Sequence, residues 1–248
     1  MLVDTHCHIH ESDFSLDKDE VIQDAQIAGV TKMICVGTSV ESSEQAIAFS
    51  QDRAGVYASI GVHPHDTKDG YDISTLAGSS SKIIAVGEIG LDYFYTNSPR
   101  EVQIEALKAQ LAVAVEHNLP VIFHVRAAFD DFWPIFDSFP GLRGVLHSFT
   151  DTKEQLDKAI ERGLFIGVNG ISTFTKDEAQ KAMFDAIPLD KMLLETDAPF
   201  LTPAPFRGTI NQPAFVKIIA EYHAERRDVS VDNIATATTT NATALFAI

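Results

Sequence analysis

The chain has 248 residues, of which 45% are hydrophobic, so it is long and apolar enough to bury a sizeable core. Its 19 Lys and Arg residues stand against 35 Asp and Glu residues, and the net charge of −16 excludes a protein that coats polyanions through a basic surface. No basic segment precedes a long apolar run, and no stretch approaches the ~20 apolar residues of a spanning helix, so we expect a cytoplasmic protein without membrane segments.

Short runs rich in apolar and β-branched residues recur along the chain, and each predicts a β-strand. These eight runs cover residues 1–8, 32–37, 56–63, 83–90, 121–126, 144–149, 164–170 and 192–197. The two cysteines, Cys7 and Cys35, lie inside such runs, where buried free thiols in a reducing compartment are expected rather than a disulfide.

Segments with helical periodicity separate the strands, most clearly from Arg100 to Asn118. Ser98, Pro99 and Glu101 predict a capping box at the start of this helix. Strands that alternate with helices predict a parallel sheet, and eight such units predict an α/β fold of the (β/α)₈ or TIM barrel type. No linker or low-complexity segment interrupts the pattern, so one domain spanning residues 1–248 is expected.

The first predicted strand ends in two histidines, His6 and His8, which flank Cys7. Because side chains alternate along a strand, both imidazoles share one face and the cysteine points to the other. Ligand-type residues also lie at the ends of four later strands: Glu88, His124, His147 and Asp197. All strand ends of a parallel barrel open onto one face, so these six side chains are expected to converge.

Each of these residues alone is more often a solvated loop group or a satisfied buried polar residue, but their recurrence at the ends of five strands favours a metal site. Six ligands exceed what one four-coordinate ion uses, whereas two divalent ions about 3.5–4 Å apart, bridged by a carboxylate, would use all of them. The imidazoles favour zinc, while carboxylates and phosphate chemistry admit magnesium or manganese. We expect Asp197 to be both a ligand and the proton acceptor for the activated water, and its neighbour Glu195 to support structure.

Substrate contacts are assigned to three residues at or beyond strand ends. His63 in GVHPH could contact a substrate phosphate, bind an extra ion or cap a loop, and His65 is expected to be solvated. Arg126 and Arg207 are candidates for phosphate binding because guanidinium matches phosphate oxygens, although either could be a surface ion-pair partner. His223 lies in a helical segment and is expected at the surface.

The segment DYFY, residues 92–95, follows the fourth predicted strand. Its aromatic rings could stack on a nucleobase, but aromatic clusters in barrel loops more often pack against the protein. Asp92 is a candidate for a residue that supports the metal ligands.

The motifs VDTHCH, GVHPH, VGEIGLDYFY with SPRE, VIFHVR, HSFT and LLETDAPFLTP form a specific combination. With them the chain closely resembles, nearly from end to end, the TatD family of metal-dependent hydrolases in the amidohydrolase superfamily. The resemblance implies a TIM barrel, a divalent-metal centre and hydrolysis of DNA phosphodiesters, often as an exonuclease. It also implies two ligand sets that share Glu88 as a catalytic bridge, namely His6, His8, Glu88 and Asp197 for one ion and Glu88, His124 and His147 for the other. The family's RNEP-like stretch is here RGTINQP, with Gln212 in place of Glu, a departure that concerns substrate contacts and not the metals.

The leading hypothesis is therefore a deoxyribonuclease that uses two metal ions to remove nucleotides from single-stranded DNA or strand ends. The acidic surface permits this because ions can neutralise one or two phosphates locally. A second hypothesis is hydrolysis of a small ester, lactone or amide, although the fourth strand supplies Glu88 and not a lysine that could be carbamylated. A third is a metal-binding quality-control factor with vestigial catalysis, against which the intact ligand set argues. The sequence indicates no protein partner and no membrane.

Overall fold

The computed structural model describes all residues from Met1 to Ile248. Its strands belong to one eight-stranded sheet whose order, β1 to β8, follows the order of the chain. Contacts divide the chain into two compact units, Met1–Ile34 with Ser148–Ile248 (unit 1) and Cys35–His147 (unit 2). The units are described in turn, and β2 (Val30–Val36) contributes residues to both.

Unit 1 contains the first strand and the last two strands of the sheet. Its elements are β1 (Leu2–Cys7), α1 (Lys18–Ile27), α5 (Lys153–Glu161), β7 (Phe165–Val168), α6 (Ile171–Phe174), α7 (Glu178–Ala186), η2 (Leu189–Lys191), β8 (Met192–Leu194), η3 (Pro213–Phe215), α8 (Val216–Arg226) and α9 (Val231–Phe246). Strands β7 and β8 pair in parallel. A parallel bridge between Cys7 and Ala198 then joins β1 to the segment after β8.

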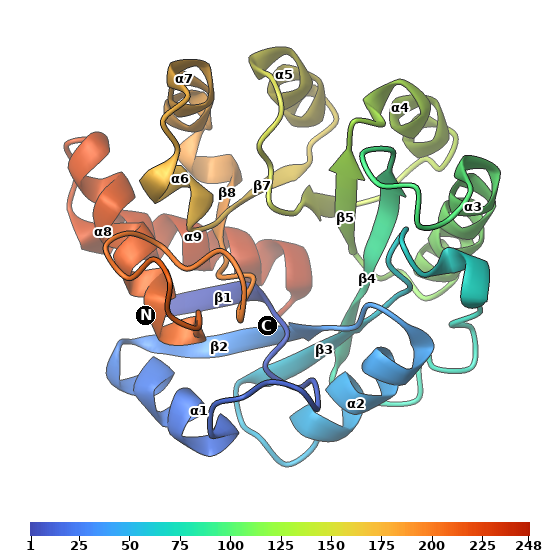
Figure 1. Ribbon diagram of the computed structural model, residues 1–248, viewed down its shortest axis with the longest axis horizontal. Helices are drawn as coiled ribbons and strands as arrows, with labels where there is room; N and C mark the ends of the chain where they lie inside the picture. The colour runs from blue at the N-terminus through green and yellow to red at the C-terminus, as the bar shows by residue number, and fades with distance from the viewer. The chain divides into compact units, whose positions relative to one another are not determined.

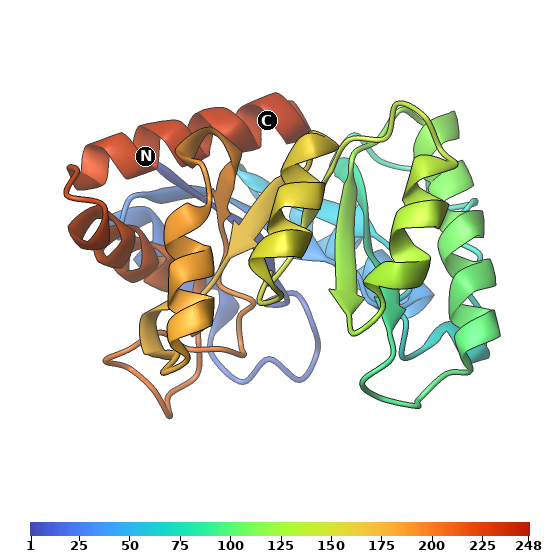
Figure 2. The same ribbon diagram turned by 90° about the horizontal axis from the view of Figure 1, so that it is seen from above.

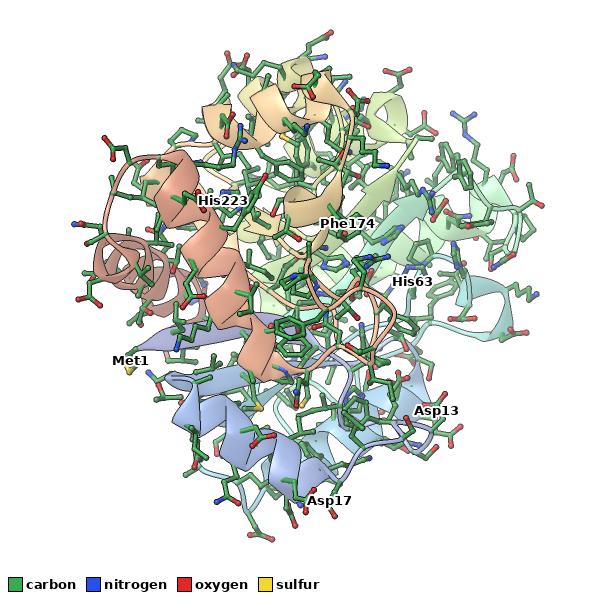
Figure 3. All side chains as sticks on the ribbon, turned by 60° about the vertical axis from the view of Figure 1, so that its left-hand side comes forward. Met1, Asp13, Asp17, His63, Phe174 and His223 are labelled. Atoms are coloured by element: carbon green, nitrogen blue, oxygen red, sulfur yellow. The ribbon has the colours of Figure 1, made fainter.

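Helix α9 packs against β1 and β8 in unit 1. Figure 2 marks both chain termini beside this helix, where Thr239 Oγ1 donates a hydrogen bond to the Met1 carbonyl at 2.9 Å. Asp17, labelled in Figure 3, is the N-cap residue of helix α1, and its carboxylate accepts from two first-turn N–H groups that a helix start leaves unpaired.

Unit 2 contains the middle strands. Its elements are α2 (Val40–Ser50), β3 (Val56–Ile60), η1 (Thr67–Asp69), β4 (Ile83–Asp92), α3 (Arg100–Glu116), β5 (Val121–Arg126), α4 (Phe129–Asp137) and β6 (Gly144–Leu146). Strand β4 pairs in parallel with β3 and β5, and Figure 1 shows α3 and α4 along one face of β4 and β5. Under α4 the Phe123 ring of β5 packs edge-on against Phe132, with centroids 5.1 Å apart.

The sheet order and the helices between consecutive strands confirm the predicted (β/α)₈ barrel class. One connection departs from it, since only the short helix η1 lies between β3 and β4. Both cysteines are buried and free, as expected. No helix combines the length and the apolar character that crossing a membrane requires. That residues 1–248 act as one domain stays a prediction.

The predicted capping box at α3 is wrong. The helix starts at Arg100 as expected, but no side chain caps it. The Ser98 hydroxyl is buried and used elsewhere, donating to the His65 carbonyl at 2.8 Å and accepting from the Lys68 N–H at 3.1 Å. Two backbone partners outside the helix therefore outcompete the local cap.

Candidate metal-binding clusters

Three predicted ligands of unit 1, His6, His8 and Asp197, come together and are called cluster 1. The two imidazole Nε2 atoms lie 3.1 Å apart, as strand alternation predicts, and Asp197 Oδ1 is 3.6 Å from His6 Nε2 and 3.4 Å from His8 Nε2. One ligand atom from each residue lies within 4.8 Å of the others. Two nitrogens and a carboxylate oxygen that converge in this way fit a divalent metal ion.

Backbone pairing holds cluster 1. The end of β1 and the segment that follows β8 stay together, because the Asp197 N–H donates to the His6 carbonyl at 2.8 Å and the His8 N–H donates to the Ala198 carbonyl at 2.7 Å. Asp197 has a φ of 59°, in the left-handed region that Asp tolerates better than most residues. The carboxylate is thus aimed by the path of the chain itself.

A buried acid in β1, which the sequence reasoning missed, supports this turn. Asp4 accepts hydrogen bonds from the Thr196 N–H at 2.9 Å and from the Thr196 hydroxyl at 2.6 Å. Burial raises the pKa of Asp4 to about 8, although the Thr196 hydrogen bonds oppose the shift. The acid therefore holds the turn at neutral pH without a buried charge. The Glu195 carboxylate has a different partner and accepts a hydrogen bond from the Ser148 N–H at 2.6 Å.

Unit 2 gathers a second set around one carboxylate, Glu88 with His63, His124 and His147, called cluster 2. Glu88 Oε1 lies 2.8 Å from His124 Nδ1, 3.4 Å from His63 Nε2 and 3.6 Å from His147 Nε2. Gly90 of β4 pairs with His124 of β5, and a side chain at this glycine would collide with the His124 carbonyl. The glycine therefore allows the close strand approach that brings Glu88 and His124 together.

Asp92, which was predicted to support the ligands, contacts two imidazoles. Its Oδ2 lies 3.0 Å from His124 Nε2 and 2.9 Å from His65 Nε2. Its Oδ1 accepts from the N–H groups of Phe94 and Tyr95 at 2.9 and 3.1 Å. Burial works against ionisation of Asp92, but hydrogen bonds, first that from His124, hold its pKa below the usual range. With its Nε2 proton held by Asp92, His124 can offer Nδ1 to a metal ion.

His124 itself is charged more readily than an ordinary histidine in the metal-free protein. Burial opposes its protonation, but hydrogen bonds to Asp92 and Glu88 outweigh burial and raise its pKa. His65, expected to be solvated, is instead partly buried by its contact with Asp92. The sequence contains one indication that Asp92 belongs to this cluster: it lies four residues after Glu88, on the same face of the strand.

The hydrogen bonds of His63 define which of its ring nitrogens carries the proton. The His65 N–H donates to His63 Nδ1 at 3.2 Å, which assigns the proton to Nε2 and makes the ring a donor toward Glu88. Burial lowers the pKa of His63, with Glu88 opposing the shift. His63, Glu88 and His124 also form a group whose ligand atoms lie within 4.8 Å of one another, so a phosphate contact and an extra metal ligand both stay predictions for His63.

The two arginines assigned to substrate lie on aromatic rings and not in ion pairs. The Arg126 guanidinium is 4.0 Å from the centroid of Phe94 and 5.1 Å from that of Tyr95. The Arg207 guanidinium is 3.8 Å from the centroid of Phe174 and donates to the Thr202 carbonyl at 2.7 Å. Both are exposed, so their remaining donors can reach a phosphate.

The surface position expected for His223 is wrong. This residue of α8, labelled in Figure 3, is fully buried, and its Nε2 lies 3.0 Å from the Ser172 hydroxyl. Burial, together with the Arg227 charge, lowers the pKa of His223 to about 3. It is a neutral core histidine.

Clusters of histidine and carboxylate in a barrel fold are the arrangement that a metal-dependent hydrolase requires. The family model described as TatD related DNase matches residues 3–247. The chain therefore belongs to the TatD family, as its motifs predict.

Two curated relatives extend over the whole chain. This chain is 36% identical over 254 residues to "Uncharacterized metal-dependent hydrolase YabD" of Bacillus subtilis (strain 168), and the match covers 100% of both proteins. It is 34% identical over 261 residues to "3'-5' ssDNA/RNA exonuclease TatD" of Citrobacter rodentium (strain ICC168), covering 100% of this chain and 98% of that protein.

A solved structure supports the fold assignment. The crystal structure of YJJV, a TatD homologue from Escherichia coli K12, superposes with a TM-score of 0.92 at 31% identity, covering 100% of this chain and 98% of the other. The shared fold agrees with the barrel class deduced from the strand order.

Proposed function

We propose that this hydrolase cleaves phosphodiester bonds of DNA, acting on single strands or strand ends as an exonuclease. The observation that carries the proposal is a pair of histidine and carboxylate clusters in a chain that shares 34% identity, over its whole length, with a protein named as a single-stranded DNA and RNA exonuclease. Phosphodiester hydrolysis is a reaction for which paired divalent ions are well suited.

We further propose that each chain binds two divalent ions, with zinc, magnesium and manganese as candidates. Cluster 1 would hold one ion through His6, His8 and Asp197, and Glu88, His124 and His147 would hold the other. The additional role of Glu88 as a bridge, which the family resemblance implies, stays a prediction. A bound divalent ion supplies positive charge for the phosphate oxygens and lowers the pKa of water.

The residues of the chain supply positioning and proton transfer. Asp197 takes the proton from the attacking water, and its backbone hydrogen bonds keep the carboxylate in place while the proton moves. His63 contacts a phosphate oxygen through the Nε2 proton that faces Glu88 at 3.4 Å in the metal-free protein, so this donor turns from Glu88 to substrate on binding. Arg126 and Arg207 contact phosphates with the guanidinium donors that their aromatic partners leave free.

The net charge of −16 limits how nucleic acid is held. A chain this acidic gains little from long-range attraction, so contacts are confined to one or two phosphates and binding falls only gently with salt. A family model that spans residues 3–247 supports one catalytic domain over residues 1–248. The free buried cysteines support a reducing compartment, and we propose the cytoplasm.

The test uses protein stripped with a chelator and reloaded separately with zinc, magnesium or manganese. Each form is given single-stranded and duplex DNA, RNA, and a panel of esters, lactones and amides, while bound metal is measured by atomic emission. We expect stepwise shortening of labelled single-stranded DNA and close to two ions per chain. The His147→Ala variant is the matched control, since it should lose one ion and most turnover.

Two other results would replace the proposal. Cleavage of an ester, lactone or amide without any cleavage of nucleic acid would assign the second hypothesis. Full metal loading with no hydrolysis of any substrate would assign a metal-binding role with vestigial catalysis.

A further inference from the structure

A large aromatic side chain stands exposed three residues after the Asp197 carboxylate. Phe200 is 59% exposed, although a ring of this size is normally buried. Its ring centroid lies 6.4 Å from that of His8, with the planes inclined by 58°. The ring therefore lies beside cluster 1, and its partner there is itself a proposed ligand.

The turn that presents Phe200 is held firmly. The Phe200 N–H donates to the Asp197 carbonyl at 2.8 Å. Asn211 is fully buried, and its Nδ2 donates to the carbonyls of Phe200 at 2.5 Å and Thr196 at 2.8 Å. One amide thus ties both sides of the turn that carries Asp197. A ring held in this way binds a partner with little loss of conformational freedom.

Other exposed aromatic residues have partners that explain their positions. Phe206 is 41% exposed, but it stacks on Phe215 with centroids 5.0 Å apart and planes within 9°. Phe94 is covered by the Arg126 guanidinium at 4.0 Å. Phe200 has neither a stacked ring nor a cation over its face, so its exposed area is open to a flat ligand.

We propose that Phe200 is the platform on which the nucleobase next to the scissile phosphate stacks. The inference rests on the proposed nuclease function and adds a subsite to it. A nucleobase is the flat aromatic group of the substrate, and stacking on a ring tolerates every base because each has a π-face. Because a nucleotide joins its base to its phosphate, a base on Phe200 places that phosphate beside His8 and Asp197.

The experiment measures kcat and KM for removal of the terminal nucleotide from two single-stranded DNA substrates. One carries all its bases, and in the other a single abasic residue replaces the nucleotide next to the bond that is cut. Wild type should favour the complete substrate by about 5- to 150-fold in KM, the range expected for one stacked base. Phe200→Ala should bind both substrates as wild type binds the abasic one.

Two variants serve as controls. Phe206→Ala removes a neighbouring exposed ring of the same loop and should keep the wild-type preference for the complete substrate. Phe200→Trp retains a flat ring and should keep it as well. Metal content is measured for every variant, so that a loss of ligand geometry at His8 is separated from a loss of stacking.

A spectroscopic readout tests the contact directly. The chain has a single tryptophan, Trp133, so Phe200→Trp combined with Trp133→Phe leaves one indole at the platform. A phosphorothioate oligonucleotide, which resists hydrolysis, should quench this fluorescence, and its abasic counterpart should not.

The possible results distinguish a failure of the Phe200 platform from a failure of the proposed nuclease function. If wild type cleaves both substrates and Phe200→Ala keeps the same ratio between them, the platform is wrong while the nuclease stands. If wild type cleaves neither DNA nor RNA, the proposed function fails and the platform fails with it. Equal quenching by both oligonucleotides also overturns the stacking contact.

Discussion

The two clusters position ligand-type side chains by different means. In cluster 1, backbone hydrogen bonds join the end of β1 to the turn at Asp197, so the path of the chain sets the geometry. In cluster 2, side chains hold side chains, because the Asp92 carboxylate accepts from His65 and His124 while Glu88 contacts the opposite nitrogen of His124. The geometry of cluster 1 should therefore survive substitution of neighbouring side chains, whereas a single substitution can disturb the geometry of cluster 2.

The largest expected effect tests whether a residue of cluster 1 does chemistry beyond binding. Asp197→Asn keeps the shape of the side chain, one coordinating oxygen and the backbone hydrogen bonds, so fold and much of the metal should survive. Loss of the proton acceptor should lower kcat on single-stranded DNA by about 10²–10⁴-fold with little change in KM. Near-normal turnover at full metal occupancy would refute the proton-acceptor role.

The next effect compares the supporting acids of the two clusters. Asp92→Asn retains the oxygen that accepts from Phe94 and Tyr95. It presents an amide N–H₂ to His124 in place of the accepting oxygen, so the His124 ring loses the contact that orients it. Metal affinity should fall by about 10- to 100-fold, as measured by competition with a chromophoric chelator.

The matched control is Asp4→Asn in cluster 1. Because the pKa of Asp4 is raised to about 8, the acid is mostly neutral at pH 7 and the amide resembles it. We expect metal affinity within a factor of about 3 of wild type, since no pairing charge is removed. Equal losses in the Asp4 and Asp92 variants would contradict the contrast between the clusters.

The sequence predicted the parts of each cluster that follow from strand geometry. Alternation places His6 and His8 on one side, and the order of parallel strands brings ligand-type residues to strand ends. The sequence could not show that His65 contacts Asp92, because a loop histidine and a strand carboxylate meet only once the connection between β3 and β4 has its shape. It also could not show that Asp4, in a β-strand run, supports a turn almost two hundred residues away.

One error was avoidable. Residues Val216, Ile219, Ala220 and His223 follow helical spacing, and all are buried. Reading His223 with this apolar face would have placed it in the core. A position in a helical segment does not by itself place a histidine at the surface, because a neutral imidazole with one hydrogen bond can be buried.

The third prediction extends the comparison from the histidines of the two clusters to His223, whose ring contacts the Ser172 hydroxyl in place of a carboxylate. Its folded pKa of about 3 lies below the ordinary value of 6.5, so the unfolded state binds more protons between these values. Stability should therefore fall as pH drops below 6.5, by up to about 1.4 kcal/mol per pH unit, and gain nothing from this group above pH 6.5.

Urea denaturation of the metal-free protein at pH 7, 6, 5 and 4.5 measures this slope. His223→Gln can retain a donor for Ser172 and cannot take up the proton, so its stability should depend less on pH than that of wild type. His117→Gln is the control, because it changes an exposed histidine at the end of α3 and should leave the wild-type slope unchanged. Parallel slopes for wild type and His223→Gln would contradict the assignment.

The smallest effect examines whether cluster 1 depends on the side chain between its histidines. Cys7 is buried, and its thiol faces the Ile34 carbonyl at 3.4 Å, on the side of β1 away from His6 and His8. Cys7→Ala should cost about 1 kcal/mol of unfolding free energy from lost packing, with both ions retained. Cys35→Ala, at a buried cysteine of β2, is the matched control with a similar cost. Loss of one ion in Cys7→Ala alone would mean that side-chain packing, and not backbone pairing, sets the geometry of cluster 1.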